Sequence, residues 1–116
     1  MDWVLPEAGS YGIQASPSLK GIEPMRIVES IPILNRWGLH LRAGAELARL
    51  CAGFKSQIKV SQGGRSVDAK SILQLLTLGA LYGTLLEFSA QGEDASEAIQ
   101  AIRILLRNWA EGGVEK

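Results

Sequence analysis

The chain has 116 residues, with 12 Lys and Arg, 12 Asp and Glu, one His and one Cys. We expect one compact domain with a short tail, because a multi-domain enzyme needs a longer chain. The formal net charge of zero argues against a protein that binds nucleic acid through a basic surface, and 47% hydrophobic residues are typical of a globular protein.

Cysteine and histidine are too few for an internal disulfide or a structural zinc site. Cys51 can form no disulfide within the chain, and one Cys with one His cannot supply the three or four ligands of a zinc site. We therefore expect a protein of the cytoplasm without a metal or other cofactor. No run approaches the roughly 18 to 20 apolar residues of a membrane span, and residues 1–7 lack the features of a signal peptide. We expect neither export nor membrane insertion.

Residues 1–24 differ in composition from the rest of the chain. They show neither helical nor strand periodicity, and they are rich in residues that break regular structure. These residues are Gly9, Gly12, Gly21, Ser10, Ser16, Ser18, Pro6, Pro17 and Pro24. We predict a flexible N-terminal extension over 1–24 and one folded domain over 25–116.

The first two predicted elements are a strand over 25–33 and a helix over about 41–53. In the strand, isoleucines recur at alternate positions, and Pro32 indicates a sheet edge, where a missing N–H costs no hydrogen bond. In the helix, apolar residues spaced i, i+3, i+4 and i+7 predict one buried face, and Gly53 indicates its end. The residues on these faces are Ile27, Ile31 and Ile33 in the strand and Leu47, Leu50, Cys51 and Phe54 in the helix.

A hairpin follows the first helix. Two short strands, 57–61 and 65–68, bracket the tripeptide Gln62-Gly63-Gly64. Paired glycines permit the positive φ angles of a tight hairpin turn. The pattern therefore predicts two antiparallel neighbours in a sheet.

A short helix and a further strand come next. Ser71 and Gln74 have the S-x-x-Q form of a capping box, which predicts a helix over 71–78 that ends at Gly79. The residues over 84–90 then read as the fourth strand.

The last helix is predicted to open at Asp94, an acidic cap that with Glu97 favours the positive end of the helix dipole. Its apolar stripe consists of Ala98, Ile99, Ile102, Leu105, Leu106 and Trp109. The element order is β-α-β-β-α-β-α. We predict an α+β fold, a two-layer open-faced sandwich in which three helices cover one face of a four-stranded antiparallel sheet.

His40 is the one imidazole available for chemistry. It directly precedes the first predicted helix, where backbone N–H groups lack helical acceptors and the dipole is positive. A phosphoryl group on its ring would meet these donors, and Arg42 could add charge-assisted hydrogen bonds. Gly38 lets the chain approach closely. The alternative is that His40 only caps or packs. A catalytic triad is excluded, because no Ser or Cys has a base and an acid at a recognisable spacing.

Two motifs together carry a resemblance to a known family. They are Asn35-Arg-Trp-Gly38-Leu39-His40-Leu-Arg42 and Val67-Asp-Ala69-Lys70-Ser71-Ile72-Leu73, followed by Leu78-Gly79, Gly83 and Ala90-Gln-Gly92-Glu93-Asp94. With their separation and the element order, they resemble the HPr family of phosphocarrier proteins over roughly 25–109.

The resemblance implies a phosphohistidine carrier of the phosphoenolpyruvate-dependent phosphotransferase system, not an enzyme. The histidine matching His40 would take a phosphoryl group from Enzyme I and pass it to an enzyme IIA-type protein, in sugar uptake or its regulation. The arginine matching Arg42 would steady the charge. The serine matching Ser71 is phosphorylated by an HPr kinase in many relatives; the alternative is a plain helix cap.

The chain departs from the family pattern after the histidine. Relatives usually read His-Ala/Thr-Arg-Pro-Ala, whereas this chain reads His40-Leu41-Arg42-Ala43-Gly44. Ala43 gives up the rigidity of proline, and Gly44 loosens the turn further. We expect phosphotransfer to be retained, at a lower rate or with a different partner.

The resemblance also implies an exposed apolar surface that docks partners. Leu73 and Leu76 fall on the face opposite Ile72, Leu75 and Leu78, so the first pair is expected to be exposed and the second set buried. Trp37 and Leu41 are expected to join the docking pair. The alternative is that all five residues of the short helix are buried. We expect Cys51 to lie in the core and Trp109 to end the buried stripe without a ligand role.

Two classes of function remain open from the sequence. One is a working phosphocarrier, expected to be a monomer. The other is a non-catalytic regulatory or docking module of the same fold, which signals through Ser71 or the surface of Leu73 and Leu76.

Overall fold

The computed structural model describes residues 26–115; the predicted extension over 1–24 lies outside them. The elements in chain order are β1 (Arg26–Pro32), α1 (Leu41–Ala52), β2 (Gln57–Gln62), β3 (Arg65–Asp68), α2 (Ile72–Leu76), β4 (Leu85–Gln91), α3 (Ala95–Ala110) and the 3₁₀ turn η1 (Gly113–Glu115). The predicted order β-α-β-β-α-β-α is confirmed, and η1 is an addition that no sequence pattern indicated.

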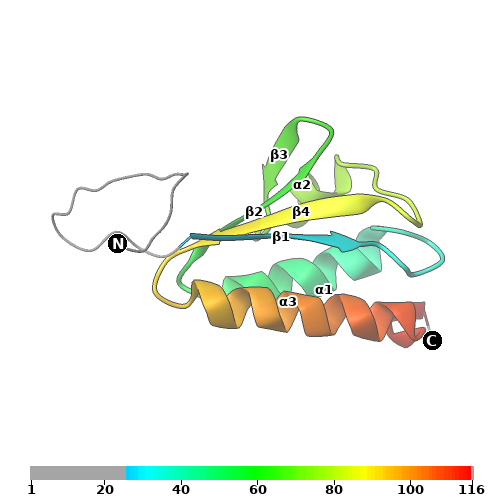
Figure 1. The fold of residues 1–116 in the computed structure, drawn as a ribbon. Helices are drawn as coiled ribbons and strands as arrows, with labels where there is room; N and C mark the ends of the chain where they lie inside the picture. The colour runs from blue at the N-terminus through cyan, green and yellow to red at the C-terminus, as the bar shows by residue number, and fades with distance from the viewer. Residues whose placement is uncertain (1–25, 116) are drawn as a thin grey trace, which may run out of the picture.

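The four strands form one antiparallel sheet in the order β1-β4-β2-β3. α1 and α3 lie side by side against one face of the sheet (Figure 1), and α2 packs against α1 and β3. The predicted two-layer α+β sandwich is therefore confirmed. β1 is an edge strand, as Pro32 indicated, and Pro32 lies opposite Leu85 at its end.

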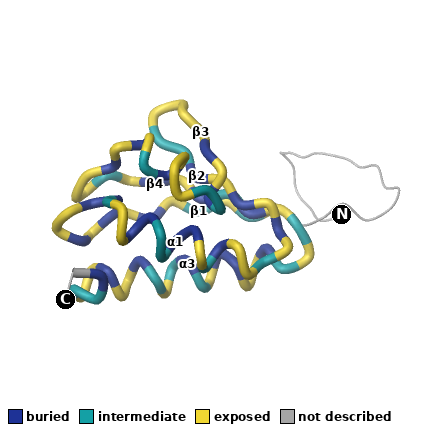
Figure 2. The backbone as a smooth tube through the Cα atoms, turned by 180° about the vertical axis from the view of Figure 1, so that it is seen from behind, coloured by how far each residue is buried: buried dark blue, intermediate teal, exposed yellow. Residues whose placement is uncertain are grey.

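The core fills the space between the sheet and the helices, where the buried stretches of α1 and α3 face the strands (Figure 2). On β4 the buried residues alternate, as a strand with one covered face requires. The largest buried side chains are Trp109, Phe88, Ile33, Leu47, Ile58, Leu75, Leu86, Ile99 and Ile102. Both predicted helical stripes contribute to this core.

One charged residue interrupts the inward-facing side of β1. Glu29 is only partly exposed, and its carboxylate forms a salt bridge with the guanidinium of Arg103 on α3, with one N–O distance of 2.9 Å. The hydrogen bond from Arg103 lowers the pKa of Glu29. Glu29, which interrupts the apolar alternation of β1, thus forms an ion pair between the sheet and the helical layer.

The β2–β3 hairpin confirms the turn prediction. Gly63 and Gly64 both have positive φ, 55° and 85°. Such angles at both central positions are those of the tight turn whose twist matches antiparallel strands. β2 extends to Gln62, one residue further than the predicted strand.

The capping box predicted at the start of α2 is present only in part. Ser71 caps α2 as expected, since its Oγ accepts from the N–H of Gln74 at 3.2 Å. The Gln74 side chain does not complete the box; its Oε1 accepts from the N–H of Asp68 at 2.9 Å. α2 also ends at Leu76, two residues before the predicted end.

Asp94 precedes α3 but does not cap it through its side chain. Its carboxylate instead accepts from the N–H groups of Lys55 at 2.8 Å and Ser56 at 2.9 Å, and from the Ser56 hydroxyl. The prediction of an acidic cap is wrong in this respect, because donors in the α1–β2 turn take the carboxylate. No helix within 26–115 is both long and apolar enough to cross a membrane.

Candidate functional site

His40 is the residue immediately before α1, as predicted. Its backbone is extended, with φ −81° and ψ −179°, and its ring makes no side-chain capping hydrogen bond. The first hydrogen bond of the helix runs from the N–H of Gly44 to the carbonyl of His40, at 2.8 Å. The alternative in which the ring serves as a helix cap is therefore wrong. His40 is half-buried.

The loop before His40 is held against the loop that precedes β4. Gly38 has φ +69°, and a Cβ built there would lie 2.4 Å from the carbonyl oxygen of Ala80. The N–H of Leu39 donates to that same carbonyl at 2.9 Å. Glycine is thus required at position 38 for its backbone angle and for the close approach. The contact places His40 next to a loop far away in sequence.

Asn35 fixes the same loop from inside. It is 1% exposed, and its amide Nδ2 donates to the carbonyl of Gly38 at 2.7 Å. Gly38 in turn donates its N–H to the carbonyl of Asn35 at 3.1 Å. Sequence reasoning assigned Asn35 no role; its preference for turns was the available signal.

Arg42 is exposed in the first turn of α1, two residues after His40. The first turn offers backbone N–H groups that precede the first helical hydrogen bond, and the helix dipole is positive there. An anionic group on the His40 ring would therefore lie at the favourable end of a 12-residue helix, within the same turn as a guanidinium.

The proposed docking residues differ in exposure. Leu41 is 65% exposed, Trp37 is 62% exposed and Leu73 is 77% exposed, so the alternative in which the whole apolar set of α2 is buried is wrong. The guanidinium of Arg36 lies 5.7 Å from the centre of the Trp37 ring, an arrangement typical of a cation–π contact.

The predicted division of α2 into two faces is wrong at two positions. Ile72, expected in the core, is 38% exposed. Leu76, expected outside, is half-buried and packs beside Gly44 of α1, since a Cβ on Gly44 would lie 3.4 Å from Leu76 Cδ2. The absent side chain at Gly44 leaves room for Leu76, and Leu75 fills the core as expected.

Two exposed apolar residues near the histidine loop were missed. Leu81 is 69% exposed and Tyr82 is 64% exposed, on the loop whose Ala80 receives the hydrogen bond from Leu39. Their signal in the sequence was a pair of large apolar residues between Gly79 and Gly83.

Ser71 lies at the start of α2, half-buried, with Leu73 two residues further on. Because α2 packs against α1 through Leu76 and Gly44, Ser71 and His40 belong to adjacent elements. Lys70 is anchored by a hydrogen bond from its Nζ to the carbonyl of Phe54 at 2.8 Å.

Cys51 and Trp109 are buried, as predicted. Burial raises the pKa of the Cys51 thiol to about 12, which disfavours the nucleophilic thiolate. The indole Nε1 of Trp109 donates to the carboxylate of Glu46 at 2.8 Å, a tie between α3 and α1 that the sequence did not indicate.

Comparisons with known proteins agree on one family. A family profile described as "PTS HPr component phosphorylation site" matches residues 27–108. The phosphocarrier protein HPr of Cupriavidus necator is 43% identical over 76 residues, which cover 66% of this chain and 85% of the relative. That of Neisseria meningitidis serogroup B is 36% identical over 81 residues, covering 70% and 91%.

Solved structures agree with the sequence matches. HPr-C-His from Thermoanaerobacter tengcongensis is similar with a TM-score of 0.71 and 35% identity, and the match covers 73% of this chain and 96% of that one. An HPr dimer from the same organism is similar with a TM-score of 0.56 and 35% identity, covering 74% and 94%. The family match leaves residues 1–26 outside.

Proposed function

The chain belongs to the HPr family of the phosphotransferase system, and we propose that His40 carries the phosphoryl group in this phosphocarrier. His40 accepts the group from Enzyme I and passes it to an enzyme IIA-type protein. The cycle takes place in the cytoplasm, with the chain as a monomer. The chain acts as a carrier, not as an enzyme, because it is itself the phosphorylated intermediate that passes between its two partners.

The observation that carries this proposal is the position of His40, directly before α1 and with its ring not used as a cap. In the first step, a ring nitrogen attacks phosphorus, the new P–N bond forms and the bond to the donor breaks. In the second step, the acceptor's nucleophile attacks phosphorus and the bond to His40 breaks. A phosphoramidate is labile enough for the second step, and imidazole is a good nucleophile for the first.

The charge on the phosphoryl group is met from two sides. On one side is the N-terminal end of α1, where backbone N–H groups and the positive end of the helix dipole stabilise a negative charge. Arg42, exposed in the same turn, supplies a guanidinium that can move with the group. The loop bonds of Asn35 and Gly38 support a fixed position for His40 during transfer.

Partners would dock on the exposed side chains around His40, namely Trp37, Leu41 and Leu73. Leu41 stands where relatives have a small residue, and its exposure means that the larger side chain enlarges this surface without crowding the core. Leu76 contributes through packing against α1 as well as through its exposed part. We attribute any altered partner preference to Leu41.

The test is incubation with phosphoenolpyruvate and Enzyme I. We expect one acid-labile phosphate per chain, absent in His40→Ala. Ser71→Ala is the matched control and should keep the label, because the label is on His40. Acid treatment distinguishes the two sites, since a phosphohistidine is lost in acid whereas a phosphoserine survives. Undiminished labelling of His40→Ala would end the proposal.

Arg42→Ala tests the guanidinium. We expect labelling to persist with slower transfer, because the start of α1 still supplies donors while the charged side chain is gone. Arg49→Ala removes an equal charge from the exposed last turn of the same helix and serves as control. Equal rates for wild type and Arg42→Ala would remove Arg42 from the site.

A second candidate function is regulation through Ser71. It is favoured by one observation: Ser71 precedes α2 and lies two residues before Leu73, the most exposed leucine of residues 26–115. An HPr kinase would place a phosphate beside that docking residue. If an HPr kinase and its phosphoryl donor give an acid-stable phosphate that Ser71→Ala abolishes, while Enzyme I and phosphoenolpyruvate give no label, this function replaces the first.

A further inference from the structure

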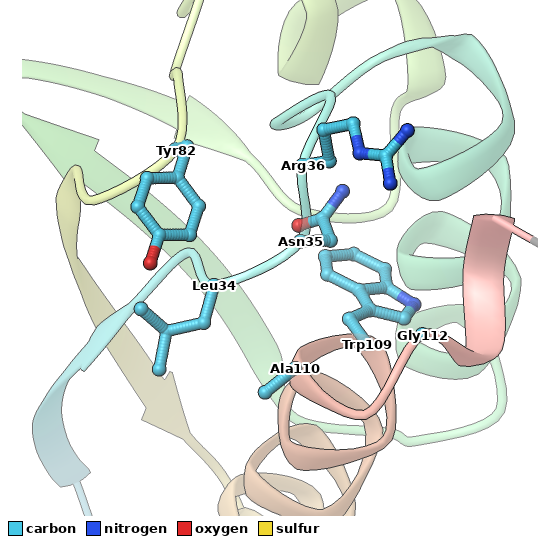
Figure 3. A pocket seen from close by; sticks show the side chains of 7 residues that line it. All are labelled: Leu34, Asn35, Arg36, Tyr82, Trp109, Ala110 and Gly112. Atoms are coloured by element: carbon cyan, nitrogen blue, oxygen red, sulfur yellow. The ribbon is translucent and has the colours of Figure 1, made fainter.

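An open hollow of about 510 Å³ lies beside the histidine loop, away from His40 itself. Its described lining consists of Leu34, Asn35, Arg36, Tyr82, Trp109, Ala110 and Gly112. In Figure 3, Trp109 and Ala110 on α3 face Leu34 and Asn35, with Tyr82 on the loop before β4. The hollow therefore joins three segments that are far apart in the sequence.

The lining of this hollow favours an apolar segment that has an acidic residue next to it. Leu34 is 41% exposed and Tyr82 is 64% exposed, so large apolar side chains stand partly uncovered at its edges. Trp109 also lines the hollow, although it is 1% exposed and belongs to the core. Arg36 is the one charged residue among the described lining residues.

The chain carries a segment of matching chemistry outside the family match. Trp3, Val4 and Leu5 form the one run of three large apolar residues within 1–24, and Asp2 and Glu7 flank it. We propose that this segment, Trp3–Leu5, docks in the hollow, with the acidic flank toward Arg36.

The length of chain suits this contact. Leu34 lies eight residues beyond Arg26, a span of roughly 26 Å for extended chain. A flexible coil of 21 residues, the number that separates Leu5 from Arg26, has an r.m.s. end-to-end distance of roughly 25 Å. A linker whose r.m.s. length matches the span gives an effective concentration on the order of millimolar. Intramolecular docking then needs only weak intrinsic affinity.

Docking would also affect the proposed phosphotransfer, and this consequence rests on the proposed function. Arg36 lines the hollow and also lies over the ring of Trp37, one of the proposed docking residues. A docked segment therefore borders the surface that Enzyme I would use. We expect Trp3→Ala to increase the rate of phosphorylation by Enzyme I.

The direct test uses the full chain and does not depend on phosphotransfer. Ser10→Cys accepts a nitroxide label selectively, because the Cys51 thiol is buried and its pKa is raised to about 12. In NMR spectra of ¹⁵N-labelled protein, we expect paramagnetic broadening of the amide signals of Leu34 and Tyr82. The double variant Trp3→Ala/Leu5→Ala, with the same label, should lose this broadening.

Matched variants on the folded domain separate docking from general proximity. Tyr82→Ala removes a wall of the hollow and should abolish the broadening at Leu34. Leu85→Ala removes a side chain of similar exposure, 60%, that does not line the hollow, and should leave the broadening unchanged. Both sites are exposed, so neither change removes a core side chain.

Three results would overturn the proposal: no broadening at Leu34 and Tyr82, broadening that survives Trp3→Ala/Leu5→Ala, or broadening that arises only between chains. The last is detected by mixing spin-labelled ¹⁴N protein with unlabelled ¹⁵N protein, and it would assign the hollow to a second copy. Failure of phosphotransfer with normal broadening would refute the proposed function alone.

Discussion

Two glycines on either side of His40 differ in what a methyl group would meet. At Gly44, inside α1, a Cβ would lie 3.4 Å from Leu76 Cδ2, an ordinary van der Waals contact. At Gly38 it would lie 2.4 Å from the backbone oxygen of Ala80, and φ is +69°. Replacement of glycine by alanine should therefore change the free energy of unfolding in opposite directions at the two positions.

We expect Gly44→Ala to stabilise the protein by about 0.5–1 kcal/mol, the difference in helix interiors between glycine and alanine. Chemical denaturation measures the free energy of unfolding. Gly38→Ala is the paired control and should destabilise. A loss of stability in Gly44→Ala would mean that Leu76 cannot yield the space that the family's alanine occupies.

At the scale of elements, α1 lacks the proline that relatives carry in its first turn. Ala43 precedes Gly44, whose N–H makes the first hydrogen bond of the helix, and the His40 ring does not accept from this turn. Proline at position 43 therefore removes no helical hydrogen bond.

We expect Ala43→Pro to stabilise the protein by roughly 0.4–1 kcal/mol, because proline reduces the entropy of the unfolded chain. Thermal melting is the measurement. Ala48→Pro, in the middle of the same helix, should instead cost about 3 kcal/mol or more. Since Ala43 is fully buried, destabilisation by Ala43→Pro would show that the core has closed around the smaller side chain.

The start of α2 offers a second test at this scale. Ser71 accepts one hydrogen bond from the N–H of Gln74, a role that Asp fills equally well. We expect Ser71→Asp to change the free energy of unfolding by less than about 1 kcal/mol. Phosphorylation by Enzyme I should become slower, because the charge stands close to Leu73.

Ser66→Asp places the same charge on exposed β3 and controls for net charge. If Ser71→Asp unfolds the protein, the main role of Ser71 is to maintain the fold. If neither stability nor rate changes, the α2 surface does not dock Enzyme I, and regulation through Ser71 loses its physical basis.

At the scale of the whole molecule, Asp94 ties the start of α3 to the turn between α1 and β2. The hydrogen bond from Ser56, with further bonds from the backbone, lowers the pKa of Asp94. A folded pKa below the unfolded value means that the contribution to stability is present at neutral pH. It is lost as the pH falls below about 4, the ordinary Asp value, and through the folded pKa.

We expect Asp94→Asn to be less stable than wild type at pH 7, with the difference shrinking below about pH 4. Denaturation at a series of pH values measures it. Wild type alone is not informative, because Glu29 also has a lowered pKa and its ion pair weakens in the same direction. Glu93→Gln removes one charge from the exposed neighbouring position as control. A difference independent of pH would exclude the ionised carboxylate as the source.

Local patterns were sufficient for the order of elements, the hairpin and the position of His40. Alternation in β1, helical spacing in α3 and the glycine pair of the β2–β3 turn each depend on neighbours within a few residues. The site was predictable as far as His40 stands before α1 with Arg42 in the same turn. The role of both rests on the family motif.

Long-range contacts decided what these patterns left open. Asp94 bonds to Ser56, 38 residues away, in preference to its own helix. Leu76 is half-buried because α2 packs where Gly44 leaves space, whereas Ile72, at the start of α2, is 38% exposed. Periodicity specifies which residues share a face, whereas burial and hydrogen-bond partners depend on which distant segment covers that face. Only the tertiary structure determines that.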